Sequence, residues 1–155
     1  MSNDQLWVSA PLFVVDVTSI NLVASFSELV GITSEMEPAE YIVSSNTSGL
    51  THTKQFGKVK PPTITLKRGM DMDGTGMKMW EWHEAAVKGV QACRSSATLA
   101  ICMPGGPGEP VTQTPFHWML ENCWISKCEI ASLKAGATDV PLMTVTLTCD
   151  RIIPA

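Results

Sequence analysis

Apolar and polar side chains alternate along two segments of the chain, and this pattern predicts strands that bury one face. In residues 63–68, isoleucine and leucine alternate with threonine and lysine. In residues 143–150, four apolar side chains alternate with three threonines and one aspartate. We therefore expect Val145 and Leu147, in the second segment, to belong to the core.

Other segments combine short apolar runs with turn-forming residues at their ends, which also indicates strands. They are residues 12–17, 24–30, 34–43, 98–103 and 116–120, with a bend at Gly31 between the second and the third. Pro104–Pro110 is dense in proline and glycine, so it predicts the tip of a hairpin between the last two. Trp118, on the returning strand, is a further core candidate.

Residues 77–88 have the apolar spacing of a helix. Met77, Trp80 and Val87 fall on one face, and Gly89 follows as a stop signal. We expect this helix to pack against the sheet and to bury Trp80 and Val87.

Residues 44–60 are rich in serine, threonine, asparagine, glycine and lysine, with too few apolar side chains to form a core of their own. The composition predicts a long exposed loop. Pro61 and Pro62 stiffen its end, because proline fixes φ and donates no backbone hydrogen bond. Loops of this length in a small domain usually carry a function, so we interpret residues 44–62 as an extended contact arm.

These elements amount to six or seven strands and one helix, without the strand–helix–strand alternation that builds parallel sheets. The predicted fold class is mostly β: a small antiparallel β-barrel or sandwich with one flanking α-helix and a long extended loop. The length suits a single domain covering 1–155. Hydrophobic residues make up 45% of the chain and charged residues 17%, and this apolar excess indicates buried contacts between subunits.

The charge pattern excludes several classes of partner. The net charge is −4 and no basic stripe is present, so nothing predicts nucleic-acid binding. No apolar run reaches the roughly 20 residues of a spanning helix. The polar start MSNDQ is unlike a secretion signal, so we expect a cytosolic protein without membrane insertion. Five cysteines without a CxxC pair predict reduced, mostly buried thiols.

Residue types that perform catalysis or bind metals form no recognisable motif. His52, His83 and His117 fall in three different predicted elements, and no cysteine pair has the spacing of a zinc site. Glu35, Glu37 and Glu40 fit the solvent face of a strand. We therefore predict no catalytic residue, no cofactor and no metal. An alternative from another class is a small barrel that binds an apolar ligand, given nine methionines and five tryptophans.

Several longer motifs occur in a fixed order: FSELVGITSEMEPAEY (Phe26–Tyr41), KQFGKVK (Lys54–Lys60), ITLKRG (Ile64–Gly69), MWEWHEAAVKG (Met79–Gly89), Arg94, FHWMLENCWISK (Phe116–Lys127) and VTLTCDRI (Val145–Ile152). Together they resemble the tail-tube protein family of contractile phages and of extracellular contractile injection particles. The resemblance covers nearly the whole chain, and its specificity lies in the order and spacing of the motifs.

The resemblance implies a fold shared with the haemolysin-coregulated tube proteins of type VI secretion. It also implies stacked hexameric rings that form a hollow needle, propelled by sheath contraction. The implied partners are copies of the chain itself, a sheath protein, baseplate or spike proteins, and a length-determining protein, cargo or DNA in the lumen. Assembly is expected in the bacterial cytoplasm, as part of a phage tail or of a phage tail-like particle that can be released.

The same resemblance suggests which side chains make the assembly contacts. They are Lys54, Phe56, Lys58 and Lys60 on the arm, and Lys67 and Arg68 at the end of the following strand. Two departures from the family pattern, the proline pair and the insertion Val111–Pro115 after the hairpin tip, keep a second interpretation open. It is a baseplate-proximal tube initiator or adaptor of the same machine.

Overall fold

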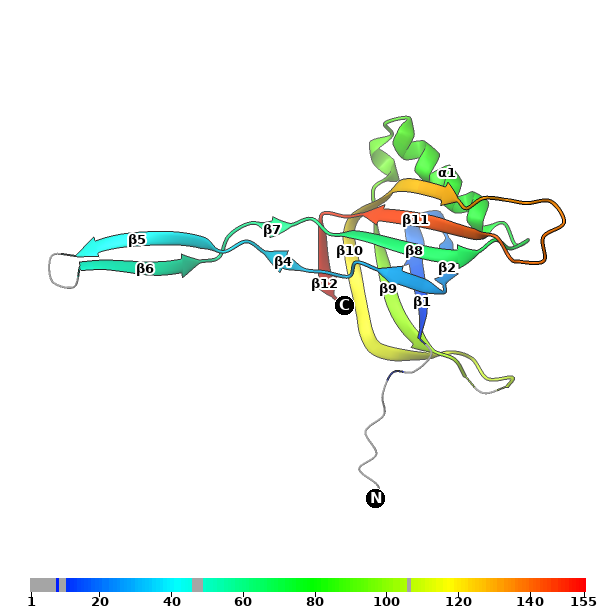
Figure 1. Cartoon of the computed structure of the whole chain (residues 1–155), viewed down its shortest axis with the longest axis horizontal. Helices are drawn as coiled ribbons and strands as arrows, with labels where there is room; N and C mark the ends of the chain where they lie inside the picture. Colours follow the sequence, from blue (N-terminus) through cyan, green and yellow to red (C-terminus); the bar gives the residue numbers. More distant parts are fainter. Residues whose placement is uncertain (1–7, 9–10, 46–48, 106) are drawn as a thin grey trace, which may run out of the picture.

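The computed structural model describes residues 8, 11–45, 49–105 and 107–155. Strands dominate this part of the chain (Figure 1). Its elements are β1 (Leu12–Val17), η1 (Thr18–Ile20), β2 (Leu22–Phe26), β3 (Glu28–Val30), β4 (Glu35–Met36), β5 (Ala39–Ser45), β6 (Gly49–Gln55), β7 (Val59–Lys60), β8 (Thr63–Gly69), α1 (Thr75–Val87), η2 (Gln91–Cys93), β9 (Ser95–Met103), β10 (Thr112–Ile130), β11 (Leu142–Thr148) and β12 (Arg151–Pro154).

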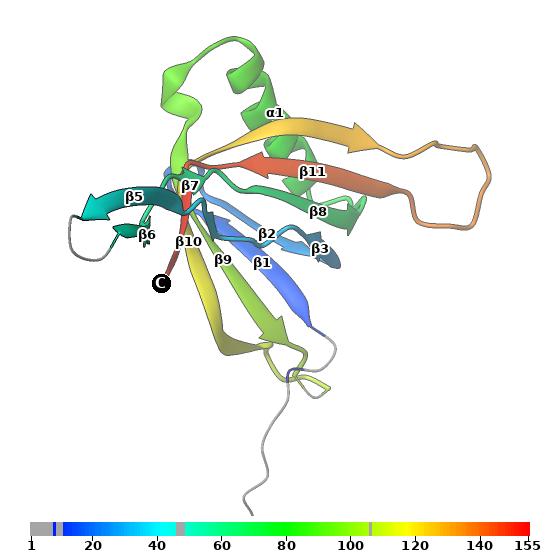
Figure 2. The same cartoon turned by 60° about the vertical axis from the view of Figure 1, so that its left-hand side comes forward.

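One curled sheet forms the body of the molecule. Its strands follow the order β2-β1-β9-β10-β11-β8-β3, with β12 also paired to β10, and all of these pairs are antiparallel. The outer strands β2 and β3 are consecutive in the chain, with only Ser27 between them. The Ser27 N–H donates to the carbonyl oxygen of Lys67 on β8 at 2.9 Å. The two ends of the sheet therefore meet, which confirms the predicted small antiparallel barrel (Figure 2).

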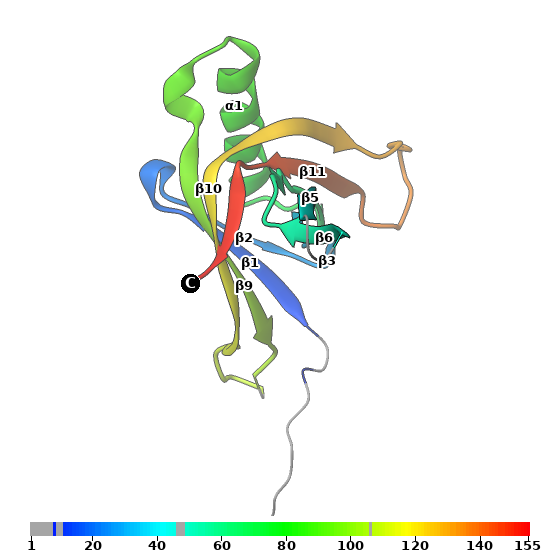
Figure 3. The ribbon, with the colours of Figure 1, turned by 90° about the vertical axis from the view of Figure 1, so that its left-hand side faces the viewer.

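The core lies inside the curled sheet and under α1, which packs across β10 and β2 (Figure 3). From the helix, Met79 and Trp82 are buried. The indole Nε1 of Trp82 donates to the carbonyl oxygen of Cys93 at 2.6 Å, and His83 Nδ1 lies 2.9 Å from the carbonyl oxygen of Ile125. The sheet supplies most of the fully buried side chains, among them Leu22, Ile64, Leu66, Leu99, Leu120, Ile125, Val145 and Leu147.

The helix is where the sequence predicts it, but it turns another face to the core. The prediction that Val87 belongs to the core is wrong, because its side chain is 64% exposed. Trp80 is half-buried and packs against the edge of the core, while Trp82 is buried. Apolar side chains occur on both faces of α1, so periodicity alone could not select the buried one.

The prediction of a long exposed loop over residues 44–60 is wrong, because most of this segment belongs to a β-hairpin. β5 pairs with β6 from Ala39↔Gln55 to Ser45↔Gly49, and the short strands β4 and β7 pair at its base. The predicted strand over 34–43 also lies outside the barrel, on this projection (Figure 1). Tyr41 and Ile42 on this strand face solvent.

The hairpin predicted around the proline–glycine run is confirmed, since β9 pairs with β10 from Thr112↔Met103 onward. β10 continues far beyond the predicted strand, to Ile130, and changes partner along its length. Its first part pairs with β9 and β12, and its last part with β11. Trp118 lies in the first part, half-buried against the core.

The cysteine prediction is confirmed. All five thiols are free, and Cys102, Cys123 and Cys149 are buried. Burial raises the pKa of Cys123, and it raises the pKa of Cys149 to about 11. These thiols are therefore protonated at neutral pH and behave as small apolar groups. Among the described residues, no helix has the length and apolar character needed to cross a membrane.

Candidate assembly surfaces

The β5–β6 hairpin projects from one end of the barrel along the longest dimension of the molecule (Figure 1). The predicted contact arm covered residues 44–62. From here on we use the name arm for residues 35–60, which include the β4–β7 pair at the base of the hairpin. A two-stranded ribbon of this kind gains little stability by itself in water. Its strands also leave unpaired backbone groups along both outer edges, which can pair with another chain.

The root of the arm is closely packed. The Glu37 N–H donates to the carbonyl oxygen of Lys58 at 2.8 Å. Opposite it, a Cβ atom placed on Gly57 would lie 1.6 Å from the carbonyl oxygen of Glu37. Only glycine allows the two chains to cross at this separation, so Gly57 fixes the direction in which the arm leaves the barrel.

The arm carries apolar side chains that nothing in its own subunit covers. Phe56 is 92% exposed, and Tyr41, Ile42 and Leu50 are all more than half exposed. Several large exposed apolar side chains on one projecting element indicate a surface for protein–protein contact. The positions of these side chains on a projecting ribbon suit contact with a separate molecule.

The predicted assembly residues of the arm lie together around Phe56. Lys54 and Lys58 flank it in the sequence, and among the described residues neither forms an ion pair. Lys60 lies 3.4 Å from Glu35 across the β4–β7 pair. The root of the arm therefore carries an exposed phenyl ring with a lysine two residues to either side in the chain, and Lys54 lies opposite Glu40 in the β5–β6 pair.

Two further charges of the arm pair with each other. His52 Nδ1 lies 2.8 Å from Glu40 Oε1, and both side chains are more than half exposed. An exposed pair of this kind contributes little stability. The glutamates at 35, 37 and 40 lie on the surface of the arm, as the sequence analysis predicts.

The side chains of the other two predicted assembly residues, Lys67 and Arg68, make contacts inside their own subunit. Lys67 Nζ is 3.9 Å from Glu28 Oε1 on the neighbouring strand β3. Arg68 is 7% exposed, donates to the Asp71 carboxylate, and places its guanidinium carbon 5.9 Å from the centre of the Phe26 ring. Arg68 is therefore buried within its own subunit, which does not fit the assembly contact that the resemblance suggests. The period-two alternation of β8 indicates that Arg68 is buried, because Arg68 lies on the same face of the strand as the buried Leu66.

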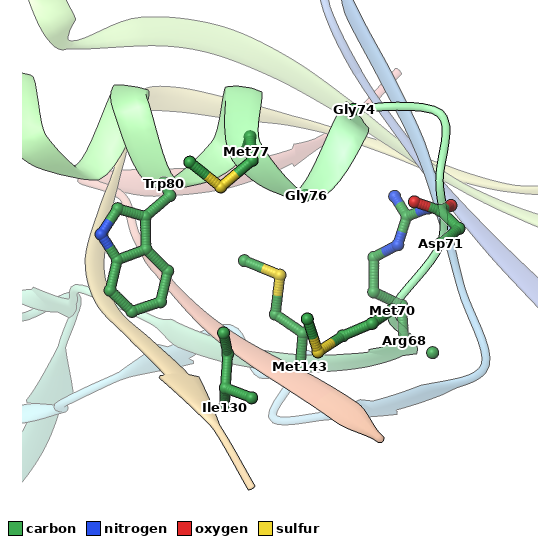
Figure 4. Close-up of a pocket in the computed structure, with 10 residues that line it drawn as sticks. Arg68, Met70, Asp71, Gly74, Gly76, Met77, Trp80, Ile130 and Met143 are labelled. Carbon is green, nitrogen blue, oxygen red and sulfur yellow. The ribbon is translucent and has the colours of Figure 1, made fainter. Parts of the chain in front are cut away.

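An apolar pocket lies at the opposite end of the barrel from the arm. Its cavity, of about 80 Å³, lies between the start of α1 and the ends of β8, β10 and β11 and opens to solvent. Figure 4 shows Met77, Trp80, Ile130 and Met143 around this space, with Met70 at its edge. We call it the methionine pocket. Thioether and indole groups form an adaptable apolar lining.

The turn that borders the methionine pocket has the sequence Met70-Asp71-Met72-Asp73. Met72 is fully exposed, and the two carboxylates flank it. The Thr75 N–H at the start of α1 donates to Asp73 Oδ1 at 2.9 Å, and this bond lowers the pKa of Asp73. Asp73 therefore stays negative at neutral pH on the turn beside the pocket, while Asp71, which lines the pocket, pairs with Arg68.

The described residues include no group of three or more metal-ligating side chains. Of the three histidines, His52 lies on the arm, His83 bonds to a backbone carbonyl beneath α1, and His117 is half-buried on β10. The prominent features of the surface are thus a projecting arm and an apolar pocket, arranged at opposite ends.

Comparison with known proteins supports an assembly role. The family described as T4-like virus tail tube protein gp19 matches residues 9–153. No match was found among curated proteins. A chain of the anti-feeding prophage tube-terminating cap is 20% identical with a TM-score of 0.65, covering 99% of this chain and 93% of that chain.

Two further solved structures share the fold. A chain of the PVC sheath–tube complex, from an extracellular contractile injection system in the extended state, is 20% identical with a TM-score of 0.62, covering 91% of this chain and 86% of that one. A type six secretion system protein is 13% identical with a TM-score of 0.53, covering 91% and 80%. Likeness at these identities concerns the fold, which agrees with the resemblance that the sequence motifs suggest.

Proposed function

The chain belongs to the tail tube protein family of T4-like viruses, and from this we propose that it is the structural subunit of the inner tube of a contractile injection system or contractile phage tail. The subunits assemble as hexameric rings, and the rings stack into a hollow needle that sheath contraction propels. The protein performs no bond chemistry in this role.

The arm is the observation that supports this proposal. It presents exposed apolar side chains and free strand edges at one end of the subunit, while the barrel provides a complete core without it. A surface on one end that contacts a different surface on the next copy produces an open, repeating stack instead of a closed dimer. Obligate contacts of this type commonly bury about 2,000 Å² or more.

Negative-stain electron microscopy of the purified chain at several concentrations tests the proposal. Hollow rings with six-fold symmetry, or tubes, are expected to appear as the concentration rises. A species that stays monomeric across the whole range would contradict it.

An arm-less variant tests the part played by the arm. Residues 40–54 are replaced by Asn-Gly, a type I′ turn that joins the paired residues Ala39 and Gln55. The barrel should fold normally, as reported by the fluorescence of the buried Trp82, and the stacks should be lost. Stacks that form without the arm would show that other surfaces hold the rings together.

The proposed partners follow from the same role. A sheath protein surrounds the tube, baseplate and spike proteins begin it, and a length-determining protein, cargo or DNA occupies the lumen. Assembly takes place in the bacterial cytoplasm, and the finished particle can be released. A ring of six copies carries about −24, six times the −4 of one chain, so salt concentration should influence the assembly of rings.

A further inference from the structure

The arm and the methionine pocket lie at opposite ends of the molecule's long axis. In Figure 1 the arm leaves one end of the barrel, while β8 ends and α1 begins at the other. When copies of one chain stack head to tail, these two ends face each other at every step. The arm therefore has a natural counterpart in the next copy.

From this arrangement we propose that the methionine pocket of one subunit receives Phe56 from the arm of the subunit stacked on it. The inference rests on the proposed tube function and adds the site at which the arm binds. Phe56 lies at the root of the arm, so it meets the facing end of the next copy while the hairpin continues along that copy's side.

The apolar surfaces of the two sites are complementary. Phe56 is almost fully exposed, and the pocket offers Met77 and Met143 around a cavity of about 80 Å³ that opens to solvent. Contacts between methionine sulfur and an aromatic ring are favourable, and an unbranched thioether adapts to the shape of the ring. An exposed aromatic residue that enters a pocket on the partner is the usual form of an interface hot spot.

The charges around the two sites are also complementary. Lys54 and Lys58 lie two residues before and two residues after Phe56, and Asp73 lies on the turn beside the pocket, where Asp71 already pairs with Arg68. Docking would bring the two lysines close to the Asp73 carboxylate. This arrangement favours the head-to-tail contact over arm-to-arm contact, in which the lysines would repel each other.

Phe56 is held ready for binding in the free subunit. Gly57, the next residue, lies against the Glu37 carbonyl oxygen, and the Glu37 N–H donates to the carbonyl oxygen of Lys58, two residues after Phe56. Both contacts restrict the backbone around Phe56. Ordering that is present before binding lowers the entropy loss on association.

Chemical cross-linking tests the proposed contact without removing the phenyl ring. Gln55→Cys places a thiol next to Phe56, and Met72→Cys places one on the rim of the pocket. Treatment of tubes carrying both substitutions with a short bismaleimide should give a ladder of covalent species longer than six subunits. If the arm instead contacted a neighbour within the same ring, the covalent species would contain no more than six subunits. Each single-cysteine variant is the control for reaction of the native cysteines.

A matched double variant provides the control for position. Gln55→Cys is combined with Val87→Cys, an exposed position at the far end of α1, about 18 Å along the helix from its start. This pair should give no ladder. A ladder of equal length from both pairs would mean that the reagent traps random collisions, and would overturn the assignment.

Substitutions at Met72 test the charge complementarity. Met72→Lys and Met72→Glu both remove the thioether from a fully exposed position, so neither should disturb the fold. Met72→Lys should raise the concentration needed for assembly by about tenfold relative to Met72→Glu, and Lys58→Glu in the same chain should restore part of the loss. Equal behaviour of the two variants would overturn the charge argument.

Phe56→Ala tests the anchor itself. Losing the burial of a phenyl ring should raise the assembly concentration by about 10-fold to 100-fold. Tubes of the Gln55→Cys, Met72→Cys variant that give no ladder, together with normal assembly of Phe56→Ala, would overturn this inference and leave the tube function intact. A wild-type chain that never assembles would overturn both.

Discussion

Replacing Gly57 with alanine should stop assembly while leaving the barrel folded. The added methyl group would sit 1.6 Å from the Glu37 carbonyl oxygen, whereas ordinary contact begins at 3.4 Å. The obstacle is backbone, so no side-chain rotation can relieve it. The two chains at the root of the arm must therefore separate by about 1.8 Å, the difference between these distances.

A small separation at the root becomes a large displacement at the tip. Neighbouring strands lie about 4.8 Å apart, so a shift of about 1.8 Å tilts the arm by roughly 20°. From Gln55 to Gly49 the hairpin extends about 20 Å, at about 3.3 Å per residue. The tip therefore moves by about 7 Å, which is more than the width of a side chain and too much for a packed interface to absorb.

The assay compares stability with assembly in two glycine variants. Gly57→Ala should unfold in urea at nearly the wild-type midpoint, because the arm contributes nothing to the core, yet it should form no tubes in electron micrographs. Gly89→Ala is the matched control, since its φ of +76° strains an alanine while a Cβ there meets open space. It should lose about 1 to 2 kcal/mol of stability and still form tubes.

The opposite effects of these two variants carry the argument. Tubes of normal appearance from Gly57→Ala would refute the view that the direction of the arm controls stacking. A large loss of stability in the same variant would also refute it, because the arm would then be part of the subunit's folding unit.

Three further outcomes are expected. Trp82→Ala should lower the free energy of unfolding by about 3 to 5 kcal/mol, and Trp80→Ala by clearly less, because only the first ring is buried; equal shifts of the urea midpoint would contradict this. Cys123 and Cys149 should resist alkylation at pH 8 in the native protein and react after denaturation, since burial raises both pKa values; rapid native labelling of either would be the contrary result. Asp73→Asn should remove a contribution to stability that the wild type retains above about pH 3.8 and loses on further acidification, because the bond from the Thr75 N–H holds the pKa of Asp73 in the folded protein below its ordinary value of 3.8; identical acid-unfolding curves would argue against it.

The sequence predicts strands well where one face is buried and the other is not. β8 and β11 show this most clearly, because their alternating apolar side chains all enter one core. The same alternation was available for Arg68, which follows Ile64 and Leu66 on the buried side of β8. A guanidinium is stable on that side because it lies over the Phe26 ring and beside Asp71.

The arm could not be predicted correctly, for a different reason. Tyr41 and Ile42 have the composition of a core strand, and a sequence does not say whether apolar side chains cover their own core or another molecule. The polar second strand, around His52 and Lys54, similarly suggested a loop, because a hairpin without a core of its own lacks the usual apolar alternation. The choice between Trp80 and Trp82 also required the packed structure, since both faces of α1 carry large apolar groups.

The arm projects from one end of the barrel only, and this gives any stack of subunits a direction. At one terminus the last ring would hold out six unoccupied arms, and at the other the last ring would offer six unoccupied pockets. The two termini are thus chemically different, even though every subunit is the same. A protein that begins the tube needs to match only one of these surfaces, and a protein that ends it needs only the other, so a start and a stop can be encoded by two relatives that each lack half of the contact.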